Sequence, residues 1–132
     1  MSLHIYIDTI PHANHRYPTV GDYFDVQTPS MKVPVRNIRV SEMGNTDYEF
    51  LVAIHEAVEQ HLCSKRGISE ESITAFDIQF ENNRAADNVD EPGNSLDAPY
   101  HKEHIFATWI ERLIANELEV NWDTYDTAVN SL

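Results

Sequence analysis

Apolar and polar residues alternate along the first third of the chain, with the period of two that is typical of half-buried strands. Leu3–Ile10 shows this alternation, and Pro11 ends the segment because proline cannot donate a hydrogen bond to a strand ladder. Further short strands are predicted over Val20–Val26 and Val33–Val40, and Pro34 indicates either an edge position or a late start for the last one. We therefore expect a small antiparallel sheet of two or three strands.

The signals that follow are those of helices. Residues 46–49 (TDYE) match a capping box, in which the Thr hydroxyl and the Glu carboxylate each accept a hydrogen bond from an unpaired backbone amide. From there a first helix is predicted to run to about Arg66, with Gly67 as a left-handed stop. Ser69 is predicted to cap a second helix, which ends near Glu81.

The last third of the chain predicts a long loop, a third helix and a docked tail. Residues 82–98 are polar and acidic, and loops of this length are usually functional or mobile. Asp97 is predicted to cap the third helix, and the tail from Asn121 is expected to pack back onto the domain through Trp122 and Tyr125. The third helix carries a wide apolar stripe, typical of a core-facing helix, made by Ile105, Phe106, Trp109, Ile110, Leu113 and Ile114.

Together these elements predict an α+β fold: a small N-terminal antiparallel sheet packed with three α-helices, with a long loop before the last helix. We expect a single domain over residues 1–132, β-rich over 1–43 and helical over 44–132. Hydrophobic residues make up 42% of the chain, which argues against disorder.

The sequence shows neither a membrane segment nor a secretion signal. No apolar run approaches the roughly 18 residues that a membrane span needs, and the N-terminus lacks a basic region followed by an apolar stretch. The single cysteine, Cys63, excludes an internal disulfide and fits a reducing compartment. We therefore expect a cytoplasmic protein without membrane contact.

The formal net charge is −13, which affects the choice of partners. A surface with this much negative charge repels phosphate backbones. We therefore do not expect direct binding of nucleic acid. It favours cations and basic protein surfaces instead, although solubility alone is also a sufficient reason for it.

Two histidine and glutamate clusters are the candidate chemistry of this chain. His55 and Glu59 are four residues apart on the first predicted helix, so both side chains project from one face with Cβ atoms about 5–6 Å apart. Glu56 lies beside them and is ionisable, but it cannot bind the same metal ion as His55 and Glu59. His101 and His104 lie three residues apart near the start of the third helix. We expect at least one of these two to complete a metal site, and the pattern leaves open which one.

A helical projection places the first pair beside the core. On the third helix, His104 lines up with Thr108 and Glu111, while His101 lies nearer the apolar stripe. His55 and Glu59 lie on the flank of the predicted core face of the first helix, so we expect them to line a groove beside the core. That predicted core face consists of Phe50, Leu51, Ile54, Ala57, Val58, His61 and Leu62.

The segment His55-Glu56-Ala57-Val58-Glu59 resembles the HExxH helix of the zincin metallopeptidases, and the resemblance covers that helix alone. It implies that His55 binds zinc and that Glu56 is the general base of a hydrolase. Glu59 stands where the family has its second histidine. With a histidine from the third helix, the ligand set would be two histidines, one glutamate and a water, which is a plausible catalytic zinc site.

An alternative from another class is a non-catalytic acidic interaction protein, with a structural metal or none. Such a protein could bind a basic partner or mimic nucleic acid by presenting carboxylates in place of phosphates. The segments RYPTVGDYF and YEFLVAIHEAVE are loosely similar to uncharacterised proteins encoded by phages and prophages, a resemblance that implies no activity.

Overall fold

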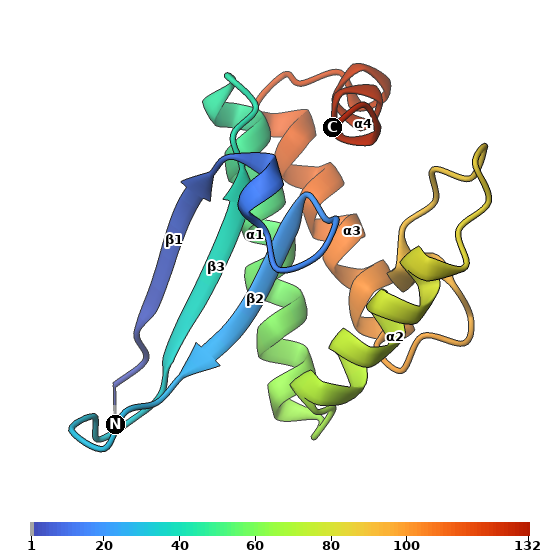
Figure 1. The fold of residues 1–132 in the computed structure, drawn as a ribbon. Coiled ribbons are helices and arrows are strands. Elements are labelled where there is room, and N and C mark those ends of the chain that lie inside the picture. The colour runs from blue at the N-terminus through green and yellow to red at the C-terminus, as the bar shows by residue number, and fades with distance from the viewer. Residues whose placement is uncertain (1) are drawn as a thin grey trace.

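Three strands form one mixed sheet (Figure 1). The structure, a computed structural model, describes residues 2–132. The strand order is β1-β3-β2, and β3 runs parallel to β1 and antiparallel to β2, with Ile38 opposite both Ile7 and Tyr23. The strands are β1 (Ile5–Ile10), β2 (Gly21–Val26) and β3 (Val35–Ser41).

The three predicted strands are confirmed, but an antiparallel arrangement is wrong for β1 and β3. The segment between β1 and β2 contains Pro11, Pro18 and the short 3-10 helix η1 (His12–Asn14), so it does not form a tight hairpin. β2 is therefore placed one strand away from β1, and β3 fills the position between them. β3 begins at Val35, immediately after Pro34, which confirms the late start, but it is the central strand and not an edge.

The helices form layers behind this sheet (Figure 1). Helix α1 packs against β2 and β3, and α3 packs against α1, so α1 lies between the sheet and α3. The α+β prediction is confirmed. Among residues 2–132 the helices are α1 (Thr46–Lys65), α2 (Glu70–Asn82), α3 (His101–Glu117) and α4 (Trp122–Asn130).

The predicted start of α1 is corrected by one residue. Asn45 is the N-cap, because its backbone is extended and its side-chain oxygen accepts hydrogen bonds from the amides of Asp47 and Tyr48. The predicted capping box therefore does not form. The carboxylate of Glu49 instead accepts a hydrogen bond from the amide of Met43 at 2.8 Å, which fixes the turn that leads into the helix.

The connection from α1 to α2 follows the prediction. Gly67 has a φ of 71°, the left-handed conformation that stops a helix at low cost for glycine. The Ser69 hydroxyl accepts a hydrogen bond from the amide of Ser72 at 3.2 Å and so caps α2.

Helix α3 begins one turn later than predicted. Its first residue is His101, because the chain from Asp97 is still in a turn, in which the amide of His101 bonds to the carbonyl of Ala98 at 3.1 Å. The loop before it contains a short 3-10 helix, η2 (Pro92–Asn94).

The tail is a fourth helix, α4, where only a docked segment was predicted. Asn121 caps it by accepting a hydrogen bond from the amide of Thr124 at 2.9 Å. The predicted long loop therefore precedes α3, which is not the last helix. Tyr125 is 2% exposed, so α4 packs onto the domain as expected of the tail.

None of the helices described in residues 2–132 has the length and apolar character to cross a membrane.

The inward faces of α1 and α3 differ from the predicted ones. Phe50 is 49% exposed and His61 is exposed, although both were assigned to the core face of α1. Trp109 and Leu113, in the predicted apolar stripe of α3, are 61% and 66% exposed. The side of α3 that is buried instead consists of Glu103, His104, Ala107, Glu111 and Ala115. Helix α3 thus turns a largely polar face inward, and this face forms the candidate site.

Candidate metal centre

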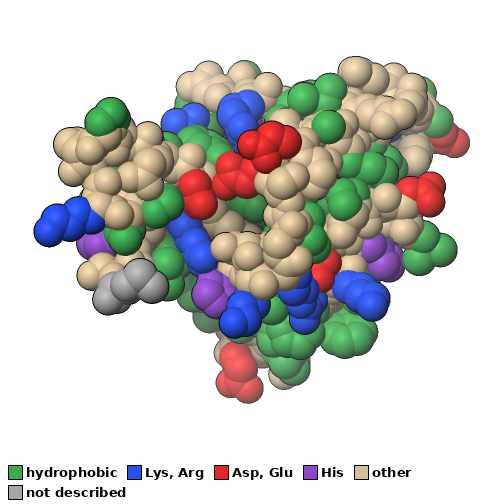
Figure 2. All heavy atoms as spheres, turned by 90° about the horizontal axis from the view of Figure 1, so that it is seen from below, with side chains coloured by type: hydrophobic (Ala, Val, Ile, Leu, Met, Phe, Trp, Pro, Cys, Tyr) green, Lys and Arg blue, Asp and Glu red, His purple; other side chains and the backbone are tan. Residues whose placement is uncertain are grey.

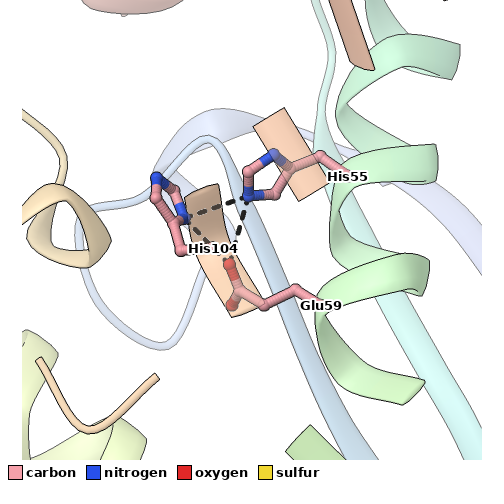
Figure 3. A group of neighbouring side chains, drawn as sticks. All are labelled: His55, Glu59 and His104. Carbon is pink, nitrogen blue, oxygen red and sulfur yellow. Dashed lines mark hydrogen bonds and ion pairs between the residues drawn. The ribbon is translucent and has the colours of Figure 1, made fainter. Parts of the chain in front are cut away.

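Three buried side chains from α1 and α3 point toward one spot (Figure 3). His55 Nε2 lies 3.1 Å from Glu59 Oε2 and 3.1 Å from His104 Nδ1, and His104 Nδ1 lies 2.9 Å from Glu59 Oε2. Each of the three residues is no more than 6% exposed. An imidazole pair and a carboxylate converging in this way could hold a metal ion.

The outer nitrogens of both imidazoles also face carboxylates. His55 Nδ1 is 2.8 Å from Glu111 Oε1. His104 Nε2 is 2.8 Å from Glu91 Oε2, at an angle that departs from a regular hydrogen bond. A carboxylate only accepts hydrogen bonds, and Glu59 faces the inner nitrogens, so both rings have a carboxylate acceptor at each nitrogen. A metal ion bound at the inner nitrogens would displace their protons and leave the outer nitrogens to donate to Glu111 and Glu91.

Further hydrogen bonds hold the carboxylates that surround the imidazoles. The Tyr125 hydroxyl of α4 donates to Glu111 at 2.6 Å, and the Tyr23 hydroxyl of β2 donates to the free oxygen of Glu59 at 2.8 Å. A histidine whose second nitrogen donates to a carboxylate is the usual arrangement around a protein-bound metal, because it fixes the tautomer and makes the ligating nitrogen more basic. Elements from across the fold therefore hold the cluster in place.

The electrostatics of the cluster favour positive charge. Burial lowers the pKa of His55, but its hydrogen bonds to Glu111 and Glu59 outweigh burial and leave the pKa well above its usual value. For His104, burial is likewise outweighed by Glu59 and Glu91, and the pKa rises to about 9. Burial raises the pKa of Glu59, but the two histidines lower it further, to about 2. The pocket thus attracts a cation, whether a proton or a metal.

Glu56 occupies a different place from the three converging residues. It lines a cavity of about 330 Å³ next to them, and its carboxylate has no hydrogen-bond partner within residues 2–132. Burial and the nearby Glu59 raise its pKa well above the usual value. Gly21 of β2 makes room for it, since a Cβ at that position would lie 2.7 Å from Glu56 Oε1. A carboxylate with these properties could accept a proton from a molecule in the cavity.

Of the four residues predicted to bind metal, the structure brings His55, Glu59 and His104 together. His101 is not among the converging side chains, because its Nδ1 lies 2.9 Å from the carbonyl oxygen of Gly93 and so faces η2. Gly93 also touches His104, where a Cβ would lie 2.3 Å from the imidazole Cγ. Only glycine at this position allows the loop to pack against the ring.

The residues that support the cluster were given no role from the sequence. The helical projection placed Glu111 on the same face as His104, two turns further on, but did not predict its contact with His55. Tyr125 was expected to be buried but not to donate to Glu111. No local sequence pattern indicates that Glu91 and Tyr23 lie near the cluster, because their proximity to it depends on tertiary folding.

Comparisons of the chain with protein-family models, with curated proteins and with solved structures found no match. The resemblance of the α1 segment to zincins therefore stays a prediction, as does the similarity to phage and prophage proteins.

Proposed function

We propose that the protein binds a divalent metal of the zinc type through His55, Glu59 and His104, and that the site is that of a degenerate zincin-like hydrolase. The observation that supports this most is the convergence of His55 Nε2, His104 Nδ1 and Glu59 Oε2, with both outer imidazole nitrogens against carboxylates. Two imidazoles and one carboxylate, with a position left for water, form a ligand set typical of catalytic zinc.

In the proposed reaction Glu56 is the general base. A bound divalent ion would supply the charge that lowers the pKa of a water molecule and polarises a carbonyl. Glu56 would accept the proton of that water, which its unpartnered position at the cavity leaves it free to do. Glu111 and Tyr125 would hold His55 in the tautomer that ligates, and Glu91 would do the same for His104. A cytoplasmic setting is part of this proposal.

Elemental analysis of the purified chain tests metal binding. One zinc-type ion per chain is expected, and His55→Ala and His104→Ala are both expected to lose it. His61→Ala is the matched control, because His61 lies on the same helix but is exposed and outside the cluster. Metal content that is unchanged in His55→Ala and His104→Ala would refute the site.

A second variant tests the catalytic part of the proposal separately. Glu56→Gln is expected to retain the metal and to lose hydrolysis, because glutamine keeps the shape of the side chain but cannot accept a proton at neutral pH. Hydrolysis can be followed on a panel of chromogenic amide and ester substrates. Equal activity in Glu56→Gln and wild type would remove Glu56 from the mechanism.

The second candidate function is a non-catalytic acidic interaction protein, which the formal charge of −13 favours. A nucleic-acid mimic needs a continuous acidic surface, whereas acidic, basic and apolar side chains are interspersed on the face shown in Figure 2. This function predicts that a chelator leaves the binding of a basic partner unchanged and that reversal of surface acidic charges abolishes it. Pull-down with and without chelator distinguishes the two functions.

A further inference from the structure

The cavity beside the proposed metal ligands is small and its walls are acidic. Its volume of about 330 Å³ is near the lower end of small-molecule sites. The wall is built from the β1–β2 connection, β2, α1, α2, the loop before α3, and parts of α3 and α4. Apolar side chains such as Val20, Val52, Ile73 and Val89 lie in the same wall, so the cavity also offers contacts for carbon chains.

Some of the acidic groups in this wall are already neutralised. Arg16 binds Asp22 through two hydrogen bonds, of 2.7 and 2.9 Å. Arg84, the one Lys or Arg that lines the cavity within residues 2–132, binds Glu81 in the same bidentate manner. No free Lys or Arg side chain of the described wall is therefore left to receive an anionic substrate.

Other carboxyl groups of the wall form no ion pair within residues 2–132 and are held by neutral donors. Glu70 accepts a hydrogen bond from the amide of Asp25, Asp90 accepts bonds from an amide and from Asn94, and Asp77 accepts bonds from the hydroxyls of Tyr17 and Tyr100. These donors are neutral, so they orient the carboxyl groups without cancelling their charge. Negative charge in a recess with low-dielectric walls attracts cations and repels anions.

The geometry of these carboxyl groups does not favour a second metal ion. Within the described part of the chain, His55, Glu59 and His104 are the one trio of potential ligands whose atoms come within 4.8 Å of one another. Glu70, Asp77 and Asp90 are spread over α2 and the following loop instead. A dispersed set of carboxyl groups suits an organic cation instead. Such a cation is larger than a metal ion, so carboxyl groups that lie further apart can contact it from several sides.

We infer that the substrate is a small organic cation, an alkylammonium or guanidinium compound, whose charged end lies against the carboxyl groups of α2 and the following loop. This inference rests on the proposed function, since the bond to be hydrolysed would lie at the His55, Glu59 and His104 end of the cavity. The apolar side chains of the same wall would receive the carbon chain.

Three hydroxamates that share one metal-binding group test the charge preference. The zinc-loaded full chain is titrated by calorimetry with 6-aminohexanohydroxamate, with uncharged hexanohydroxamate and with the monohydroxamate of adipic acid. We expect the amine to bind about tenfold more tightly than the uncharged compound, as one added charge-assisted contact would produce, and the acid to bind most weakly. Equal affinities, a preference for the acid, or no hydroxamate binding by the zinc-loaded chain would overturn the inference.

Two conservative variants connect the preference to the wall. Glu70→Gln and Asp90→Asn keep the acceptors of the hydrogen bonds above and remove the charge, so the tenfold preference is expected to fall while hexanohydroxamate binding stays the same. Glu71→Gln, an exposed neighbour on α2 that does not line the cavity, is the matched control. Uptake of a second metal ion that Glu70→Gln or Asp90→Asn abolishes would also overturn the inference.

A measurement without metal separates this inference from the proposed function. In His55→Ala, hexylamine and hexanol are titrated and followed by NMR shifts of cavity residues. The amine alone is expected to bind, and Glu70→Gln is expected to weaken it. Absence of metal from the wild-type chain refutes the proposed function, whereas equal responses to hexylamine and hexanol refute the cationic substrate.

Discussion

Helix α1 meets its two neighbours through different kinds of interface. Toward the sheet, Ala53 belongs to the same apolar cluster as Ile38 and Val40 of β3. Toward α3, the same helix buries His55 and Glu59 against His104 and Glu111. An apolar interface is stabilised by burial alone, whereas buried polar groups stabilise a fold only when all are satisfied. The interface of α1 with the sheet therefore stabilises the fold by itself. The stability of its interface with α3 depends on whether a metal ion lies between the polar side chains.

The largest expected effect is on the α3 side. In wild type, zinc at a thousandfold excess over its Kd should add about 4 kcal/mol to the free energy of unfolding. His104→Ala should abolish this increment, so that zinc and chelator give the same free energy of unfolding for the variant. Urea unfolding of both proteins, with zinc and with chelator, measures the difference. A zinc increment that survives in His104→Ala would show that the ion binds elsewhere.

The sheet side should show no such dependence on metal. Ile38 is 1% exposed, and Ile38→Ala is expected to cost about 3 kcal/mol through lost burial and the cavity left behind. The cost should be the same in zinc and in chelator, because Ile38 has no contact with the ligands. Unequal costs in the same urea experiment would mean that the two interfaces of α1 are coupled.

A substitution in the loop before α3 can disturb the α3 side without replacing a ligand. The Cβ of Gly93→Ala would overlap the His104 ring, so the ring or η2 must move. We expect zinc affinity to fall by about a hundredfold, the upper end of the effects of groups that orient ligands. Gly21→Ala, whose Cβ would meet Glu56 instead, is the control and should leave zinc affinity close to that of wild type. Competition with a chromogenic chelator measures both, and equal losses would contradict this difference.

Loss of one supporting hydroxyl should have a smaller effect on the same interface. Tyr125→Phe removes the donor to Glu111 and leaves the packing of the ring in place, so zinc affinity should fall about tenfold. Tyr48→Phe is the matched control, because Tyr48 packs edge-on against Tyr125 at a centroid distance of 5.2 Å. If both variants lose affinity equally, the hydrogen bond from Tyr125 to Glu111 is not what orients His55.

The contrast between the interfaces also explains which features could be predicted. The His55 and Glu59 pair needs only helical spacing, and His104 needs only a helix at its position, so both could be proposed from local patterns. The apolar stripe of α3 misled the same reasoning, because Trp109 and Leu113 are exposed and a polar face is buried. Periodicity assumes that the apolar face is the inner one, and that assumption fails where polar side chains gather for function.

Tertiary arrangement accounts for the other differences. Alternation identified β1 and β3 but carries no information on which strand lies beside which, so their parallel pairing could not be predicted. The proximity of Glu91 to His104 depends on the course of a long loop, for which the sequence has no comparable rule.

The smallest expected effect concerns pH, at the cavity wall away from the ligands. Burial raises the pKa of Asp77 to about 6, although the Tyr100 and Tyr17 hydroxyls lower it. The folded protein therefore holds this proton more tightly than the unfolded chain, and the resulting stability is complete below about pH 4 and lost as the pH rises through about 6. Solvent reaches the cavity, so we expect a change of about 1 kcal/mol over this window, less than full conversion of the shift would give. Asp77→Asn should reduce the change in the free energy of urea unfolding between pH 4 and pH 7 by about this amount, and Asp97→Asn, on an exposed turn, should not. If the slope is the same in Asp77→Asn and wild type, the wall carboxyl titrates as it would in water, and burial at the cavity contributes nothing to it.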